Sequence, residues 1–110
     1  MRQYEIRWAS LPDPIGRRPV LLLSRDPAYE YLHRVIVAEV TTVVRGIPQE
    51  ITLGRRDGLT RACVANLDNL HTVAVHRLGR RIASLRRARI PEVKRALGYV
   101  LGWPELTLGE

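Results

Sequence analysis

Hydrophobic and polar residues alternate along several short stretches of the chain, which predicts a protein built mainly from β-strands. From Tyr4 to Trp8 apolar and charged residues alternate, as expected for a strand with one buried face. The stretch from Arg18 to Ser24 contains the run Val-Leu-Leu-Leu, which is typical of a strand buried on both faces. The same reasoning predicts further strands at 34–42, 49–53, 62–67, 71–75 and 82–85.

Glycine and proline residues mark the connections between these strands. Residues 10–16 hold two prolines and a glycine, which indicates a loop, and residues 54–58 are a second turn signal. The Asp26-Pro27 pair is typical of a helix start, with the aspartate as cap and the proline at the first helical position. Only one or two helical turns fit before the next strand.

The last third of the chain changes to a helical pattern. Apolar residues recur at helical spacing from Ile90 to Leu101, which predicts one amphipathic helix over about 88–101. Pro91 fits the first turn of this helix, whereas Gly98 weakens its interior by about 1 kcal/mol relative to alanine. The residues after Gly102 are expected to be irregular.

Several short strands followed by one terminal helix describe a small, strongly curved or half-open barrel. The predicted fold class is therefore mainly β with a C-terminal helix (α+β). The barrel is expected over about 4–85, and residues 1–110 are expected to form a single domain. A chain of this length can bury a core without disulfides or metals.

The charge of the chain points to a polyanionic partner. It carries 18 basic and 11 acidic residues, for a net charge of +7, and Lys94 is its only lysine. Arginine is the side chain whose planar fork matches phosphate oxygens and stacks on bases, so nucleic acid is the expected partner. The alternative is an arginine-rich composition on a merely solvated surface, and composition alone does not decide between them.

Other classes of protein are not indicated. Cys63 is the single cysteine, expected to be a small buried residue, and it excludes a disulfide framework. The three histidines show no metal-ligand spacing with carboxylates, so neither a metal nor another cofactor is expected. The longest apolar run is far too short to span a membrane, and the N-terminus lacks the apolar stretch of a signal peptide. We therefore expect a cytoplasmic protein with no membrane association.

Three segments in a fixed order carry a family resemblance. The first is Gly-Arg-Arg-Pro followed by an apolar strand (16–24), and the second is a valine-rich strand that ends in Thr41-Thr42. The third is Asp-Gly-Leu-Thr-Arg (57–61) followed by Leu-Asp-Asn-Leu-His-Thr-Val (67–73). In this order and spacing, the chain resembles the MazF/PemK family of toxin ribonucleases from about residue 4 to residue 102.

The resemblance implies an SH3-like barrel of the CcdB-like type that forms a homodimer. It also implies an mRNA interferase, an endoribonuclease that cleaves single-stranded RNA sequence-selectively without a metal. Such toxins are neutralised by a cognate antitoxin, which lays an acidic, partly disordered segment across the active groove.

Family positions for the catalytic groups map onto Arg18 and Thr41. Cleavage through the RNA's own 2′-hydroxyl needs in-line geometry, stabilisation of the phosphorane charge and proton transfers, but no protein nucleophile. Arg18 would clamp the scissile phosphate, and Thr41 would donate a hydrogen bond to a phosphate oxygen. Arg17 lies on the opposite strand face, so the two arginines are not expected to share one role; a slip in register would exchange them. For each residue the alternative is an ordinary surface or strand position.

Further positions are expected to contact RNA, although their match to the family pattern is incomplete. The first loop is short, with Asp13 as its only acid, and Ala62-Cys63 stands where many relatives have Asp-Ser. The RNA motif cleaved by relatives therefore cannot be transferred. A histidine at position 71 can contact phosphate or serve as an auxiliary acid, or it can be a partly buried strand residue. The expected RNA-binding residues are Asp13, Arg17, Thr42, Asn69 and His71.

Two competing functions remain open at this point. One is a non-catalytic toxin of the same fold that acts by binding a protein, as gyrase-poisoning relatives do, and the other is a basic barrel that binds nucleic acid structurally. The combination of Gly-Arg-Arg-Pro with Thr41 argues against both. The C-terminal arginines can attract RNA, receive the acids of an antitoxin, or form a solvated face; they are Arg80, Arg81, Arg86, Arg87 and Arg89.

Overall fold

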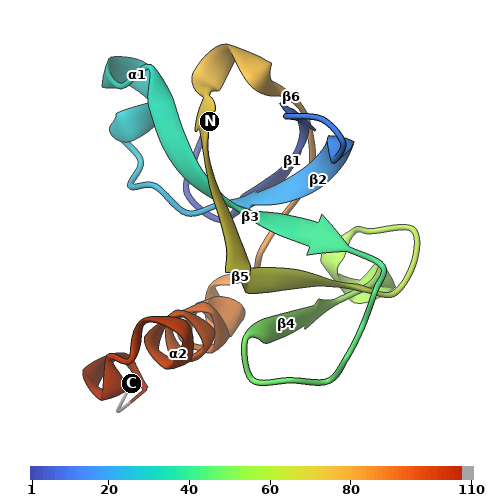
Figure 1. Cartoon of the computed structure of the whole chain (residues 1–110), viewed down its shortest axis with the longest axis vertical. Helices are drawn as coiled ribbons and strands as arrows, with labels where there is room; N and C mark the ends of the chain where they lie inside the picture. The colour runs from blue at the N-terminus through green and yellow to red at the C-terminus, as the bar shows by residue number, and fades with distance from the viewer. Residues whose placement is uncertain (108–110) are drawn as a thin grey trace.

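The computed structural model describes residues 1–107, which form one antiparallel sheet curled into a half-open barrel (Figure 1). The strand order across the sheet is β4-β5-β3-β2-β1-β6. The helix α2 lies against the lower end of the barrel beside β4 and β5. The elements are β1 (Glu5–Leu11), β2 (Gly16–Leu22), α1 (Ala28–Tyr31), β3 (Arg34–Thr41), β4 (Glu50–Leu53), β5 (Cys63–Ala74), β6 (Leu78–Ser84) and α2 (Ile90–Leu101).

Two apolar clusters form the core, one on each face of the central strands. The first contains Leu21 and Leu67, and Val93 of α2 packs against it. The second contains Val20 and is covered by Tyr29 of α1. Because successive side chains of a strand point to opposite faces, the uninterrupted apolar run of β2 supplies both clusters. The prediction that this strand is buried on both faces is therefore confirmed.

The strand β5 differs from the prediction of two separate strands at 62–67 and 71–75. It is one continuous strand, and the residues between these segments form a β-bulge. Asn66 pairs with Glu39 and Leu70 pairs with Ala38, so residues 67–69 are extra residues opposite two neighbours on β3. The Asp-Asn pair that resembles a turn is thus accommodated within a strand. Similarly, β1 extends to Leu11 and β6 begins earlier than expected.

The helices confirm one expectation and correct another. The amphipathic helix α2 begins with a proline in its first turn, as the periodicity predicts. In α1, however, Pro27 occupies the N-cap position and no side chain caps the helix. Asp26 does not cap because its Oδ1 accepts a hydrogen bond from the backbone N–H of Gln3 at 2.7 Å. This carboxylate instead ties the N-terminal segment to the start of α1.

Residues 102–107, which follow α2, are ordered rather than irregular, and the rest of the expected irregular tail lies outside the described residues. Within 102–107 the chain forms a 3₁₀ turn, η4 (Pro104–Leu106), and the Trp103 N–H donates a hydrogen bond to the Gly98 carbonyl at 2.8 Å. A Cβ atom at Gly98 would lie 2.8 Å from the Trp103 carbonyl oxygen and 2.9 Å from the Leu106 Cβ. Gly98 therefore allows the tail to pack onto the helix. Across residues 1–107, no helix has the length and apolar character needed to cross a membrane.

Arg89 connects several elements beside the start of α2. It lies in η3 (Arg87–Arg89) and donates to Asp57 Oδ1 at 2.8 Å, to both Glu92 oxygens at 2.8 and 2.9 Å, and to the Thr52 carbonyl at 2.6 Å. Asp57 belongs to η1 (Arg55–Asp57), Glu92 to α2 and Thr52 to β4. One guanidinium thus joins the terminal helix to the edge of the sheet.

Candidate active site

A cluster of three charged or polar side chains lies on neighbouring strands near the end of the second apolar cluster. Arg18 on β2 donates from Nη1 to Glu39 Oε1 at 3.1 Å, and His71 Nε2 lies 2.9 Å from Glu39 Oε2. The Glu39 side chain on β3 is only 11% exposed, compared with 38% for Arg18 and 23% for His71. One nearly buried carboxylate therefore holds a partly exposed guanidinium and a partly exposed imidazole.

The alternation of the strands explains why these side chains meet. Val37 and Glu39 point to the same face of β3, and Val37 is fully buried in the second cluster. His71 pairs with Val37, and Arg18 is two residues from Val20, which pairs with Glu39. All three polar side chains thus extend one sheet face beyond its apolar part. Burying the Glu39 carboxylate without a partner would cost folding free energy, and the hydrogen bonds with Arg18 and His71 offset that cost.

Thr41 belongs to the same face of β3, two residues after Glu39. Continuing the register of β2 and β3 by two residues sets Thr41 opposite Arg18. Its Oγ1 accepts a hydrogen bond from the Val43 N–H at 3.2 Å, so the hydroxyl proton is available to donate elsewhere. The end of β3 thus presents a hydroxyl donor just beyond the last pair of β2 and β3, Val20 with Glu39.

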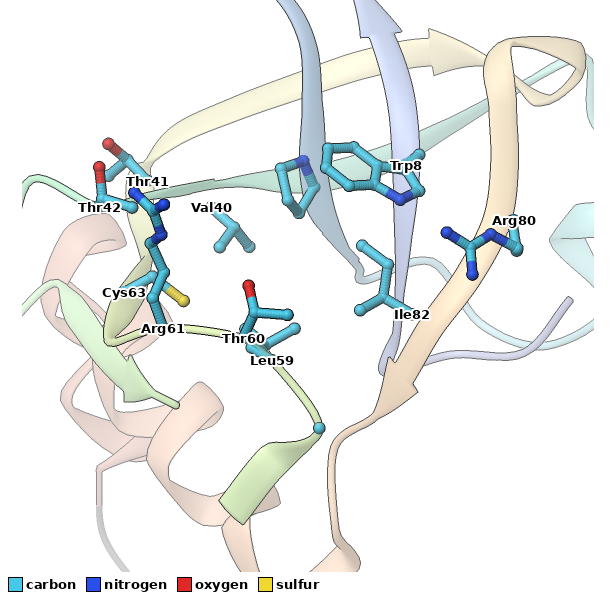
Figure 2. Close-up of a pocket in the computed structure, with 12 residues that line it drawn as sticks. Trp8, Val40, Thr41, Thr42, Leu59, Thr60, Arg61, Cys63, Arg80 and Ile82 are labelled. Carbon is cyan, nitrogen blue, oxygen red and sulfur yellow. The ribbon is translucent and has the colours of Figure 1, made fainter. Parts of the chain in front are cut away.

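A pocket of about 570 Å³ opens on the other face of the same strands (Figure 2). Pro19 and Val40 contribute to its wall because they alternate with Arg18 and Glu39. Figure 2 shows Thr41 and Thr42 at one end and Trp8 with Arg80 toward the other. The lining residues are Trp8, Pro19, Val40, Thr41, Thr42, Gly58, Leu59, Thr60, Arg61, Cys63, Arg80 and Ile82. The pocket therefore has an apolar wall and basic side chains, with Thr41 at one end.

Comparison with known proteins identifies the family. A model described as "PemK-like, MazF-like toxin of type II toxin-antitoxin system" matches residues 2–101. The chain belongs to this family. A relative named probable endoribonuclease MazF5, from Mycobacterium tuberculosis, is 38% identical over 94 residues, covering 84% of this chain and 85% of the relative.

Solved structures of MazF proteins share the architecture. The Mycobacterium tuberculosis toxin MazF-mt6 superposes with a TM-score of 0.83 at 35% identity, over 89% of this chain and 96% of that one. A mycobacterial endoribonuclease in complex with its cognate antitoxin gives a TM-score of 0.83 at 26% identity, over 94% and 97% of the two chains. These similarities confirm the expected fold class, a curled antiparallel sheet with a C-terminal helix.

Within this MazF/PemK-family fold, the predicted site residues divide into groups. Arg18 and His71 meet at Glu39, while Thr41 and Thr42 line the pocket. Arg17 lies on the opposite face from Arg18, as its place in the strand predicts, and its guanidinium stacks 4.1 Å from the centre of the Trp8 ring. The two remaining predicted residues are exposed, and no hydrogen bond described for residues 1–107 joins them to the cluster; they are Asp13 and Asn69.

Sequence reasoning missed Glu39. The available signal was a single acid within the apolar strand Val-Ile-Val-Ala-Glu-Val, which indicates a buried charge that needs a partner. Its two partners are 21 and 32 residues away along the chain, so only the strand register reveals them.

Cys63 fits the expectation of a buried structural residue in the pocket wall. Burial raises the pKa of its thiol, and the negative charge of Asp57 raises it further, which disfavours the reactive thiolate. Among residues 1–107, no group of three or more histidine, cysteine, aspartate or glutamate side chains has the arrangement of a metal site.

The C-terminal arginines do not form one uniform basic face. Arg89 is a structural residue whose side chain is only 13% exposed, bonded to Asp57 and Glu92. Arg80 lines the pocket, and Arg81 lies 4.0 Å from a Glu5 oxygen. Only part of this charge is therefore available to a polyanionic partner.

Proposed function

We propose that this MazF/PemK-family chain is a toxin endoribonuclease that cleaves single-stranded mRNA sequence-selectively. The observation that carries the proposal is Arg18, held by a nearly buried carboxylate on the sheet face that also carries the Thr41 hydroxyl. Relatives at 37% to 38% identity are named endoribonucleases, which supports the same activity here. Nothing comparable supports a gyrase-poison-like toxin or a purely structural nucleic-acid-binding module.

Arg18 and Thr41 have the chemistry that RNA cleavage through the 2′-hydroxyl requires. One Nη1 bond fixes Arg18 to Glu39, and the other guanidinium N–H groups stay available for the scissile phosphate. The fixed positive charge would stabilise the phosphorane as negative charge develops, and Thr41 would donate to a phosphate oxygen. Neither role needs a metal. The expected products carry a 2′,3′-cyclic phosphate and a 5′-hydroxyl.

The proposed RNA path continues from this centre onto the surrounding residues. Arg17 stacked on Trp8 and the hydroxyl of Thr42 would contact the flanking nucleotides, while Asp13 and Asn69 would act from the neighbouring loop and bulge. These contacts set register and base preference, whereas the chemistry belongs to the cluster.

The pocket on the other face of these strands, which Thr41 and Thr42 also line, suits a cognate antitoxin with an acidic segment. The chain has a net charge of +7, and the pocket combines an apolar wall with the guanidinium groups of Arg61 and Arg80. An acidic peptide with apolar side chains would complement both properties and cover the RNA path. We further propose that the chain acts as a single domain, forms a homodimer and works in the cytoplasm, where its mRNA substrate is found.

A cleavage assay in EDTA tests the proposal. Purified protein is incubated with a mixed RNA pool, and new 5′-hydroxyl ends are mapped for the wild type, Arg18→Ala and a matched control. Arg95→Ala is that control, since it removes the same charge from an exposed position of α2. We expect cleavage by the wild type and the control, and at least about a 100-fold loss in Arg18→Ala because a preorganised charge contact is removed.

The opposite outcomes are equally clear. No cleavage by the wild type refutes the endoribonuclease, and equal cleavage by Arg18→Ala refutes the proposed centre. RNA binding without cleavage would instead favour the structural nucleic-acid module.

A further inference from the structure

His71 has one ring nitrogen engaged and one left open beside the proposed phosphate clamp. We propose that His71 is the general base that takes the 2′-hydroxyl proton, and that Glu39 is the residue that positions it. This inference rests on the proposed RNA cleavage and assigns a proton acceptor to it. Arg18 and Thr41 serve charge and orientation, and neither side chain is suited to accept a proton at neutral pH.

The hydrogen bond to Glu39 determines which nitrogen can react. A carboxylate only accepts hydrogen bonds, so Nε2 carries the proton that it shares with Glu39 Oε2 at 2.9 Å. Nδ1 of the neutral ring is then the acceptor, and it makes no hydrogen bond to the described residues. Within residues 1–107, no fully buried side-chain nitrogen or oxygen lacks a partner, and the His71 side chain is 23% exposed, so Nδ1 is not fully buried. Nδ1 is therefore the ring nitrogen that remains for a substrate.

Glu39 is held in place from two sides. Arg18 occupies Oε1 and His71 occupies Oε2, and the side chain is nearly buried between β2 and β5. A carboxylate fixed in this way selects one tautomer of the ring, fixes its orientation and stabilises the imidazolium that forms on proton transfer. In enzymes with a serine nucleophile, a carboxylate orients an imidazole, and the imidazole takes the proton of the serine hydroxyl. Here the RNA would supply the hydroxyl.

The position of Arg18 connects the base to the phosphate. Because Arg18 and His71 bind the two oxygens of one carboxylate, the guanidinium and the imidazole are neighbours on this sheet face. In a ribonucleotide the 2′-hydroxyl is itself close to the 3′-phosphate. The proposal therefore has one nucleotide engage Arg18 through its phosphate and Nδ1 through its 2′-hydroxyl.

Water is the only further reactant that the proposed step needs. Nδ1 takes the proton of the 2′-hydroxyl while the 2′-oxygen forms a bond to phosphorus. The bond between phosphorus and the 5′-oxygen then breaks with its electron pair, and the 5′-oxygen takes a proton from water. The products are a 2′,3′-cyclic phosphate and a 5′-hydroxyl, and His71 returns its proton to solvent.

The first test compares steady-state cleavage by the wild type, His71→Ala and His76→Ala. The substrate is an RNA oligonucleotide that contains a site mapped for the wild type. His76 is an exposed histidine in η2 (Val75–Arg77) and serves as the matched control. We expect His71→Ala to lower kcat by about 10²-fold or more with little change in KM, since general base catalysis contributes 10² to 10⁴. His76→Ala should match the wild type.

Chemical rescue separates catalysis from structure. Free imidazole added to His71→Ala should restore cleavage in a saturable way, and it should not restore Arg18→Ala. A purely structural loss would not respond to imidazole. Glu39→Gln tests the positioning role, because its amide must direct an N–H group at Arg18 or at His71, both of which are donors. We expect a lower kcat with KM nearly unchanged, and recovery of part of the activity in Glu39→Asp.

The outcomes distinguish this inference from the function on which it rests. If the wild type cleaves no RNA, both are overturned. If the wild type cleaves and Arg18→Ala does not, but His71→Ala retains wild-type kcat, the base assignment alone is wrong. A folded His71→Ala that loses activity and shows no response to imidazole also overturns it.

Discussion

Arg89 is the residue whose replacement should reveal most about how this barrel is held together. It is a single side chain that donates to carboxylates in η1 and α2 and to a carbonyl of β4. Arg89→Met keeps much of the apolar stem and removes the guanidinium. The change therefore isolates the polar contacts that join the terminal helix to the sheet.

The expected loss follows from the burial of the partners. Asp57 has a side chain only 5% exposed, so removing Arg89 leaves a buried carboxylate without its cation. Breaking such a pair costs about 3 to 5 kcal/mol. Asp57 Oδ2 still accepts the Gly54 N–H at 3.0 Å, and Glu92, 35% exposed, can regain water. These remaining interactions set our expectation at the lower end, about 3 kcal/mol of unfolding free energy.

Urea denaturation followed by tryptophan fluorescence measures this loss. Arg87→Met is the matched control, because Arg87 is an exposed neighbour in the same turn and should change stability by less than about 0.5 kcal/mol. In Asp57→Asn combined with Arg89→Met, the loss should be smaller than the sum of the single losses, since the two side chains share one interaction. If Arg89→Met is as stable as Arg87→Met, Arg89 does not join the helix to the sheet.

Two further stability predictions follow from the described contacts. Gly98→Ala should destabilise the protein by about 1 to 3 kcal/mol despite the better helix propensity of alanine, because its Cβ would crowd Trp103 and Leu106; unchanged stability in urea would contradict this packing. Hydrogen bonds from Arg89 hold the pKa of Glu92 below its ordinary value of 4.5. The ionised Glu92 therefore contributes its full share of the unfolding free energy above pH 4.5, and this share is lost as the pH falls through the lower pKa of the folded state. Glu92→Gln should therefore show a weaker loss of unfolding free energy than the wild type between about pH 5 and pH 3, and an equal loss would contradict the linkage.

The spacing of apolar residues predicted most of the helices and strands, because each element must bury its own apolar face. The periodicity of α2 and the apolar run of β2 each follow from which faces must be buried. The errors arose where a distant contact overrides a local preference. Asp26 has the residue type of a helix cap but bonds to Gln3, and Gly98 reads as a weak helix position until the packing of the tail is known.

The candidate site was only partly accessible from sequence. The family pattern indicated Arg18 and Thr41 as catalytic candidates, and His71 was a candidate RNA contact. The structure joins Arg18 and His71 through Glu39, which the pattern did not indicate. Glu39 could not be assigned because its partners depend on strand register. Register in turn depends on the bulge in β5, which resembles a turn in the sequence.

The length of the bulge in β5 limits which deletions the site can tolerate. Residues 63–66 and 70–74 of β5 are two arms that flank the bulge. Because side chains alternate between faces, the number of extra residues in the bulge determines which face each residue of the second arm points to, relative to the first arm. Deleting one residue from 67–69 would leave the arm that pairs with β4 in place and shift the other arm by one. His71 would then point away from Glu39, although composition and strand length would hardly change. The length of this short segment, more than its chemistry, keeps the imidazole and the guanidinium on one carboxylate.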